Sequence, residues 1–114
     1  MIILKKSIGR ITINLKAIYV GSDLIIIVSG GDKEHLGAIS YGGVDDKSGT
    51  IKFKNHMDDV ISDMFLKEIE KVFNGNYAIC AGIHLDNITK EEISQIKKLS
   101  KQLIEELILI IKGE

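Results

Sequence analysis

The chain has 114 residues, of which 45% are hydrophobic and 27% charged, and its formal net charge is −1. This length fits one domain with a single core, and the composition excludes the disordered and fibrous classes. The 15 basic residues are balanced by 16 acidic ones. That balance argues against a nucleic-acid partner, because proteins that bind nucleic acids use a surplus of Lys and Arg. We therefore predict one domain, residues 1–114, that meets small ligands or protein partners.

Neither a secretory signal nor a membrane segment is predicted. The opening MIILKK places its apolar residues before its lysines, which is the reverse of a secretory signal. No apolar run elsewhere reaches the roughly 18 residues that suggest a membrane-spanning helix. The single cysteine, Cys80, fits a reducing compartment. The expected location is the cytoplasm, without a membrane partner.

The first half of the chain carries the patterns of four strands. Residues 9–21 alternate between apolar and polar side chains, which is typical of a half-buried strand. A turn at 21–23 leads into the apolar run 24–29, so these segments predict a hairpin whose second strand is central in its sheet. Residues 35–42 and 49–55 predict a third and a fourth strand, joined by a glycine-rich charged loop.

The pattern changes to helical spacing at Met57. Apolar residues then recur three and four positions apart, namely Val60, Ile61, Met64, Phe65, Ile69, Val72 and Phe73. Gly75 suits the left-handed position that ends a helix. The almost wholly apolar segment 77–83 predicts a fifth, interior strand.

A second helix is predicted over 90–111. Thr89 and Glu92 have the spacing of a capping box at its start. Its main apolar stripe comprises Ile96, Leu99, Leu103 and Leu107, and a second set, Ile104, Ile108 and Ile111, widens that stripe. The surplus suggests a further partner, most simply a second subunit. The predicted fold is α+β, in the order β-β-β-β-α-β-α: a mainly antiparallel five-stranded sheet with both helices on one face, in a homodimer or higher homo-oligomer.

Three histidines stand at the boundaries of these elements. His35 stands where the glycine loop meets the third strand, His56 begins the first helix, and His84 follows the last strand. Such positions present functional groups, and histidine is the commonest metal ligand. Each histidine alone is more often a turn residue or a cap, and their spacing matches no local zinc motif. A divalent metal site would need all three to converge in space, which the pattern leaves open.

The segment SGGDKEHLG around Gly30 and Gly31 has two interpretations. Consecutive backbone N–H groups in a glycine turn can form an anion-binding nest, but the segment is neither a P-loop nor GxGxxG. The structural alternative is a tight turn that uses the positive φ angles open to glycine. Taken alone, the segment favours the turn.

Three further side chains have expected roles. Asp58 is expected to cap the first helix, whereas Asp59 could orient His56 as a supporting carboxylate. Cys80 is expected to be a small core residue of the fifth strand rather than a nucleophile.

Three segments together are similar to a known family: DLIIIVSGGDKEHLGAIS, NHMDDVISDMF and CAGIHLDNITKEEI. They resemble the LpdD-like prenylated-flavin chaperones, the small D subunit of gallate-type hydroxyarylate decarboxylase systems. The resemblance runs from residue 21 to residue 93, and more loosely to the end of the second helix. Each segment is moderately specific, and their shared order and spacing strengthen the match.

The resemblance implies an accessory chaperone rather than an enzyme. Its members accompany UbiD-type decarboxylases and the flavin prenyltransferase that makes prenylated FMN. The implied role is to bind prenylated FMN and assist its delivery, maturation or protection. The family motifs fall on Gly30, Gly31, His35 and Gly37, on His56, Asp59 and Ser62, and on Gly82, His84, Asn87 and Thr89. Met57 departs from the family pattern, which tends to have a basic residue there.

From these motifs we take a candidate cofactor site of Gly30, Gly31, His35, Gly37, His56, Asp59, His84 and Asn87. Two alternatives remain. One is a small metal-dependent enzyme with His35, His56 and His84 as ligands. The other is a non-catalytic assembly subunit that binds the decarboxylase through its apolar C-terminal helix.

Overall fold

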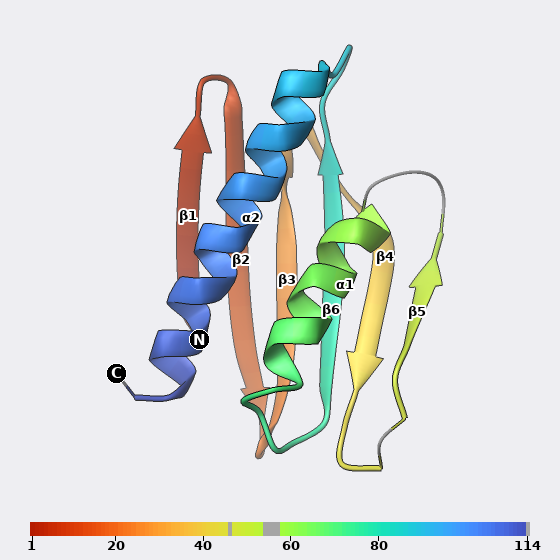
Figure 1. Ribbon diagram of the computed structural model, residues 1–114, viewed down its shortest axis with the longest axis vertical. Helices are drawn as coiled ribbons and strands as arrows, with labels where there is room; N and C mark the ends of the chain where they lie inside the picture. Colours follow the sequence, from red (N-terminus) through yellow and green to blue (C-terminus); the bar gives the residue numbers. More distant parts are fainter. Residues whose placement is uncertain (46, 54–57, 114) are drawn as a thin grey trace.

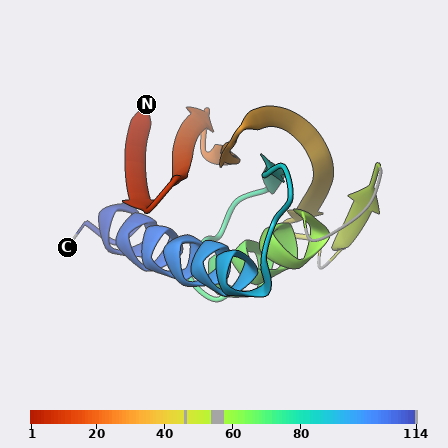
Figure 2. The ribbon, with the colours of Figure 1, turned by 90° about the horizontal axis from the view of Figure 1, so that it is seen from above.

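A six-stranded sheet carries two helices on one face (Figure 1, Figure 2), in a computed structural model that describes residues 1–45, 47–53 and 58–113. The elements in chain order are β1 (Ile2–Ile8), β2 (Ile11–Val20), β3 (Asp23–Gly31), β4 (Lys33–Gly42), β5 (Gly49–Lys52), α1 (Asp58–Ile69), β6 (Tyr77–His84) and α2 (Lys90–Ile111). The strands lie side by side in the order β1-β2-β3-β6-β4-β5. The α+β class and the placement of both helices on one face are confirmed.

The prediction of five strands was wrong, because β1 was missed. Inward and outward positions alternate along β1, but the inward set includes Lys6 and the outward set includes Ile3, which is 61% exposed. The apolar pattern that normally reveals a strand is therefore broken. The sheet is mixed as well: β3 pairs in parallel with β6, and the other four pairings are antiparallel.

The predicted bounds of the second helix, 90–111, are the observed bounds of α2. The capping box of α2 is present, with the Thr89 side chain accepting from the Glu92 N–H and the Glu92 side chain accepting from the Thr89 N–H. Helix α1 ends at Ile69, so Val72 and Phe73 fall beyond it. No helix among the described residues is long and apolar enough to cross a membrane.

Most of the widened apolar stripe of α2 packs against other parts of the same chain. Ile104 and Leu107 are almost fully buried, and Ile108 and Ile111 pack against the core. Helix α2 lies over β1 and β2. The strand β1, which was not predicted, therefore supplies the partner surface for the additional apolar residues of α2. The homo-oligomer stays a prediction, without support from this stripe.

The link between β3 and β4 crosses the end of β6. The segment around Asp32 was expected to be a tight turn between two strands, and the two strands it joins, β3 and β4, have β6 between them in the sheet. Gly31 is opposite His84 in one pairing and Lys33 is opposite His84 in the other. The Asp32 N–H donates to the His84 carbonyl oxygen at 2.7 Å. This crossing brings two of the three histidine segments together.

Candidate functional site

His35 and His84 lie on adjacent strands, with ring centroids 6.4 Å apart and the rings edge to face. Their side chains are 38% and 46% exposed, so both rings are open to a ligand. His56 lies outside the described residues, and so does its predicted convergence with the other two. We call His35, Asp58, His84 and Asp86 the histidine site.

A bulge in β4 places His35 against the neighbouring strand. The pairing of β4 with β6 shifts between Glu34 and Ala38, and such bulges redirect side chains and often lie next to functional sites. A Cβ at Gly82 would lie 1.5 Å from the His35 carbonyl oxygen, and one at Gly37 would lie 1.9 Å from Asp58 Oδ2. Only glycine at these two positions allows the segments to approach this closely.

Asp58 anchors His35 from the start of α1. Its side chain is 2% exposed, and its Oδ2 lies 2.9 Å from His35 Nε2. Its Oδ1 accepts the backbone N–H of Ile83, also at 2.9 Å. One buried carboxylate therefore ties α1, β4 and β6 together at the site.

The two aspartates were expected to have different roles. Asp59 was expected to orient His56, which lies outside the described residues, so that pairing stays a prediction; among the described residues its carboxylate lies 3.9 Å from Lys52 Nζ, with its side chain 27% exposed. Asp58, expected only to cap the helix, holds a histidine. A signal was available: Asp58 lies three and seven positions before the buried Ile61 and Phe65, so it faces the core.

His84 is held by Asp86, two residues further along. Its Nε2 lies 2.9 Å from Asp86 Oδ1, and this hydrogen bond lowers the pKa of the Asp86 carboxyl. An ionised carboxylate can only accept, so Nε2 carries the hydrogen and a neutral His84 keeps its lone pair on Nδ1. A carboxylate at Asp58 imposes the same arrangement on His35. The site thus offers two imidazoles whose Nδ1 atoms can accept a hydrogen bond or bind a metal.

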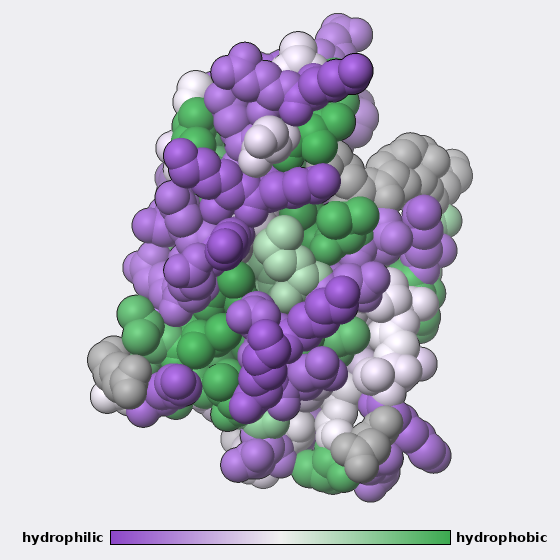
Figure 3. All heavy atoms as spheres, in the orientation of Figure 1, coloured by the Kyte–Doolittle hydropathy of each residue, from purple (hydrophilic) through white to green (hydrophobic). Residues whose placement is uncertain are grey.

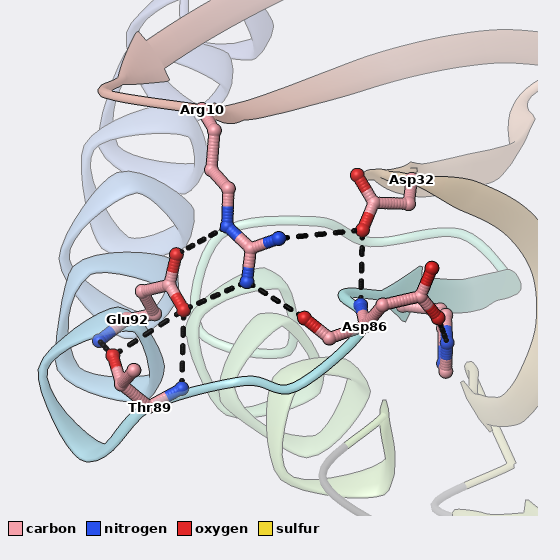
Figure 4. Close-up of polar contacts among 6 residues, drawn as sticks. Arg10, Asp32, Asp86, Thr89 and Glu92 are labelled. Carbon is pink, nitrogen blue, oxygen red and sulfur yellow. Dashed lines mark hydrogen bonds and ion pairs between the residues drawn. The ribbon is translucent and has the colours of Figure 1, made fainter.

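Arg10, in the turn between β1 and β2, organises the loop that follows His84 (Figure 4). Its Nε donates to Glu92 at 2.6 Å, its Nη2 donates to the Asp86 carbonyl oxygen at 2.8 Å, and its Nη1 lies 3.6 Å from Asp32. The Asp86 N–H in turn donates to Asp32 at 2.9 Å. The hydrogen bond from Arg10 lowers the pKa of Glu92 to about 2. Sequence analysis missed Arg10 and Asp32, because these contacts join residues up to 82 positions apart.

An apolar pocket of about 450 Å³ adjoins the histidine site. Its lining consists of Val60, Ile83, His84, Leu85, Ile88, Ile93 and Lys97, which come from α1, the end of β6, the following loop and the start of α2. On this side of the molecule, hydrophobic side chains reach the surface between the two helices (Figure 3). His84 and Lys97 are the polar members of the lining that the structure describes.

The remaining predicted residues shape the backbone. Gly30 and Gly31 belong to β3, opposite Ile83 and His84 of β6, and not to an open glycine loop. Gly31 has a φ of 80°, and a Cβ there would lie 2.1 Å from the His84 carbonyl oxygen. Asn87 has a φ of 53° and forms part of the turn before α2.

Comparison with known proteins decides the family. The model of the prenylated flavin chaperone LpdD-like domain matches residues 7–112. The chain belongs to this family. Protein LpdD of Lactiplantibacillus plantarum is 32% identical over 94 residues, which cover 78% of this chain and 69% of that protein. The LpdD-like family implies a role with prenylated flavin and UbiD-type enzymes.

The predicted metal site of this LpdD-like domain lies partly inside and partly outside the described residues. Residues 1–45, 47–53 and 58–113 contain no group of three or more His, Cys, Asp or Glu side chains that could hold a metal ion. The predicted set of His35, His56 and His84 includes one residue outside these ranges. A metal at this position stays a prediction.

Proposed function

We propose that this LpdD-like protein binds prenylated FMN in the pocket beside His84 and assists its delivery to a UbiD-type decarboxylase. The observation that carries the proposal is the composition of the pocket: an apolar wall with one imidazole and one ammonium group. Its volume lies within the range of about 300–1,000 Å³ that is usual for sites of small ligands and cofactors.

Each part of the lining suits one part of the cofactor. The prenylated ring system is largely apolar, and Ile83, Leu85 and Ile88 present hydrocarbon to it. The ammonium of Lys97 is a cation for the phosphate. The Nδ1 lone pair of His84 can accept a hydrogen bond from a ring N–H. When bound, prenylated FMN would supply the chemistry of the decarboxylase that receives it, while the chaperone supplies only binding and shelter.

The pocket is partly open to solvent, which suits transfer of the cofactor to another protein better than its permanent retention. Val60 and Ile88 in its lining are 43% and 37% exposed. A ligand on such a surface is shielded along one side and remains accessible to a second protein on the other. We therefore expect the flavin prenyltransferase and the decarboxylase to act as donor and acceptor of the cofactor.

Gel filtration with absorbance detection tests the binding. Wild-type protein should retain prenylated FMN, and it should raise the activity of an apo-decarboxylase supplied with the cofactor. Ile88→Asp should abolish retention, because it places a charge on the apolar wall. The matched control is Ile110→Asp, since Ile110 is 41% exposed on the last turn of α2 and is absent from the pocket lining. Wild-type protein that neither retains the cofactor nor activates the enzyme would end the proposal.

A second pair of variants tests the phosphate contact. Lys97→Met should weaken binding of prenylated FMN but leave binding of the dephosphorylated, prenylated riboflavin unchanged. Lys98→Met removes the same charge one position away, outside the pocket lining, and should affect neither ligand. Equal loss of both ligands in Lys97→Met would mean that Lys97 contributes packing and not charge recognition.

Separate experimental results test the assembly alternative and the metal alternative. If Ile110→Asp binds the cofactor but no longer activates the decarboxylase, the C-terminal helix is an assembly surface. The metal alternative is favoured by the two carboxylate–histidine pairs, because metal-bound histidines commonly donate their other ring N–H to a carboxylate. Elemental analysis decides it: metal-free protein with full chaperone activity would leave that alternative without support.

A further inference from the structure

We propose that Arg10 is the positioning residue for His84, which it orients through Asp86 without touching the imidazole. Arg10 stands in the turn between β1 and β2, far from both histidines in the sequence. Its guanidinium reaches three acceptors on three separate segments: Glu92, the carbonyl oxygen of Asp86, and Asp32. The planar fork of arginine suits such a set of acceptors, and a lysine ammonium does not.

Asp86 transmits the constraint to the histidine. Its carbonyl oxygen accepts from Arg10, its N–H donates to Asp32, and its carboxylate holds His84 Nε2 (Figure 4). The residue is therefore held at three points although it lies in a loop, where the sheet ladder no longer fixes the backbone. Both backbone contacts of Asp86 depend on Arg10. Arg10 donates to the Asp86 carbonyl oxygen itself, and it also pairs with Asp32, which accepts from the Asp86 N–H.

His35 does not depend on this arrangement. Its imidazole is held by Asp58 at the start of α1, which is not one of the three residues that Arg10 contacts. Loss of Arg10 should therefore disturb one histidine and spare the other. His35 becomes an internal reference within the same molecule.

The matched control is Lys6. Its Nζ lies 3.2 Å from Glu106, so Lys6 also joins β1 to α2 by an ion pair, and its side chain is 35% exposed against 45% for Arg10. Lys6→Gln and Arg10→Gln each remove one positive charge and one contact to the same helix. Only Arg10→Gln releases Asp86.

The test uses nitrogen-15 spectra of the imidazoles, backbone amide exchange, and retention of prenylated FMN; the last of these rests on the proposed function. In Arg10→Gln the His84 ring signals should shift towards a mixture of tautomers, while His35 keeps its single tautomer. Exchange of the Asp86 amide should accelerate about tenfold, the value of one lost hydrogen bond, and binding of prenylated FMN should weaken by a similar factor. Arg10→Lys should restore none of the three readouts, and Lys6→Gln should resemble wild type throughout.

The outcomes separate the two proposals. Unchanged His84 signals in Arg10→Gln would overturn the positioning role, whatever happens to the melting temperature. Altered His84 signals with unchanged flavin binding would leave the positioning role intact and refute the use of His84 in the pocket. Recovery of the His84 signals and of Asp86 amide protection in Arg10→Lys would also overturn the inference, because charge alone would then suffice.

Discussion

Replacing Asp58 by alanine should destabilise the protein far more than the same change at the adjacent Asp59. Asp58 is 2% exposed and accepts the buried N–H of Ile83. Leaving that donor without a partner costs about 1–3 kcal/mol. The contact with His35 adds about 0.5–1 kcal/mol at most, because the imidazole is 38% exposed and screened by water. We therefore expect Asp58→Ala to lower the free energy of unfolding by about 2–4 kcal/mol.

Asp59 supplies the comparison. Its carboxylate lies 3.9 Å from Lys52, whose side chain is 51% exposed, and an ion pair of this kind contributes about 0–1 kcal/mol. Both aspartates stand in the first turn of α1, so the lost interaction with the helix dipole is similar for both and drops out of the difference. The expected gap between the two variants is about 1–4 kcal/mol.

Urea unfolding followed by circular dichroism measures this gap. Asp58→Asn refines the test, because its amide oxygen can still accept from Ile83 while its NH₂ meets His35. We expect Asp58→Asn to recover most of the stability and to move the His35 hydrogen from Nε2 to Nδ1. A loss below about 1 kcal/mol in Asp58→Ala, or an equal loss in Asp59→Ala, would refute the assignment of Asp58 as the anchor.

Three other outcomes follow from single contacts. Gly82→Ala should lower the melting temperature more than any aspartate variant, since its Cβ would lie 1.5 Å from the His35 carbonyl oxygen; a melt like wild type would contradict this approach of the strands. Arg10 lowers the pKa of Glu92 from 4.5 to about 2, so its stabilisation is complete above pH 4.5 and is lost as the pH falls from there towards 2. The stability difference between wild type and Glu92→Gln should shrink over that range, and a constant difference would contradict the ion pair. Cys80 is only partly buried and lies outside the hydrophobic core in which it was expected. This partial burial raises the pKa of its thiol, so alkylation at pH 8 should be slower in native than in unfolded protein, and equal rates would contradict the burial.

Local sequence signals were enough for most of the elements. The capping box of Thr89 and Glu92 placed the start of α2, because both of its hydrogen bonds join residues only three positions apart. The strands β2 and β3 and the helical stripe of α1 were found from their apolar periodicity. In each case the residues that form the element also carry the pattern that reveals it.

Local sequence patterns could not predict the order of the strands in the sheet. The position of β6 between β3 and β4 depends on partners about fifty residues apart, such as Val28 and Ala81. The early strand β1 carries a lysine on its inner face, and that lysine meets Glu106 near the end of α2. The strand order and the strand β1 both depend on contacts between residues far apart in the sequence. Neither can therefore be recognised from a periodic pattern within its own segment.

The same argument explains which site residues could be anticipated. The histidines were noted because their side-chain chemistry is rare and they stand at element boundaries. Asp58 and Asp59 could not be separated by residue type, since only the position of Asp58 on the buried face of α1 distinguishes them. Arg10 was missed because a turn between two strands is an ordinary place for an arginine.

The motif glycines and histidines serve the site in different ways. The β3–β4 crossing, Asp58 and β6 approach one another closely because three positions are glycine, namely Gly31, Gly37 and Gly82. A Cβ at any of these positions would clash with its neighbour. Their replacement should therefore remove ligand binding together with stability. His84 is 46% exposed and pairs with an exposed carboxylate, so its replacement by alanine should leave the unfolding midpoint almost unchanged. A site built this way is expected to lose binding of prenylated FMN in His84→Ala while the fold survives, and loss of both together would mean that the imidazole is part of the scaffold.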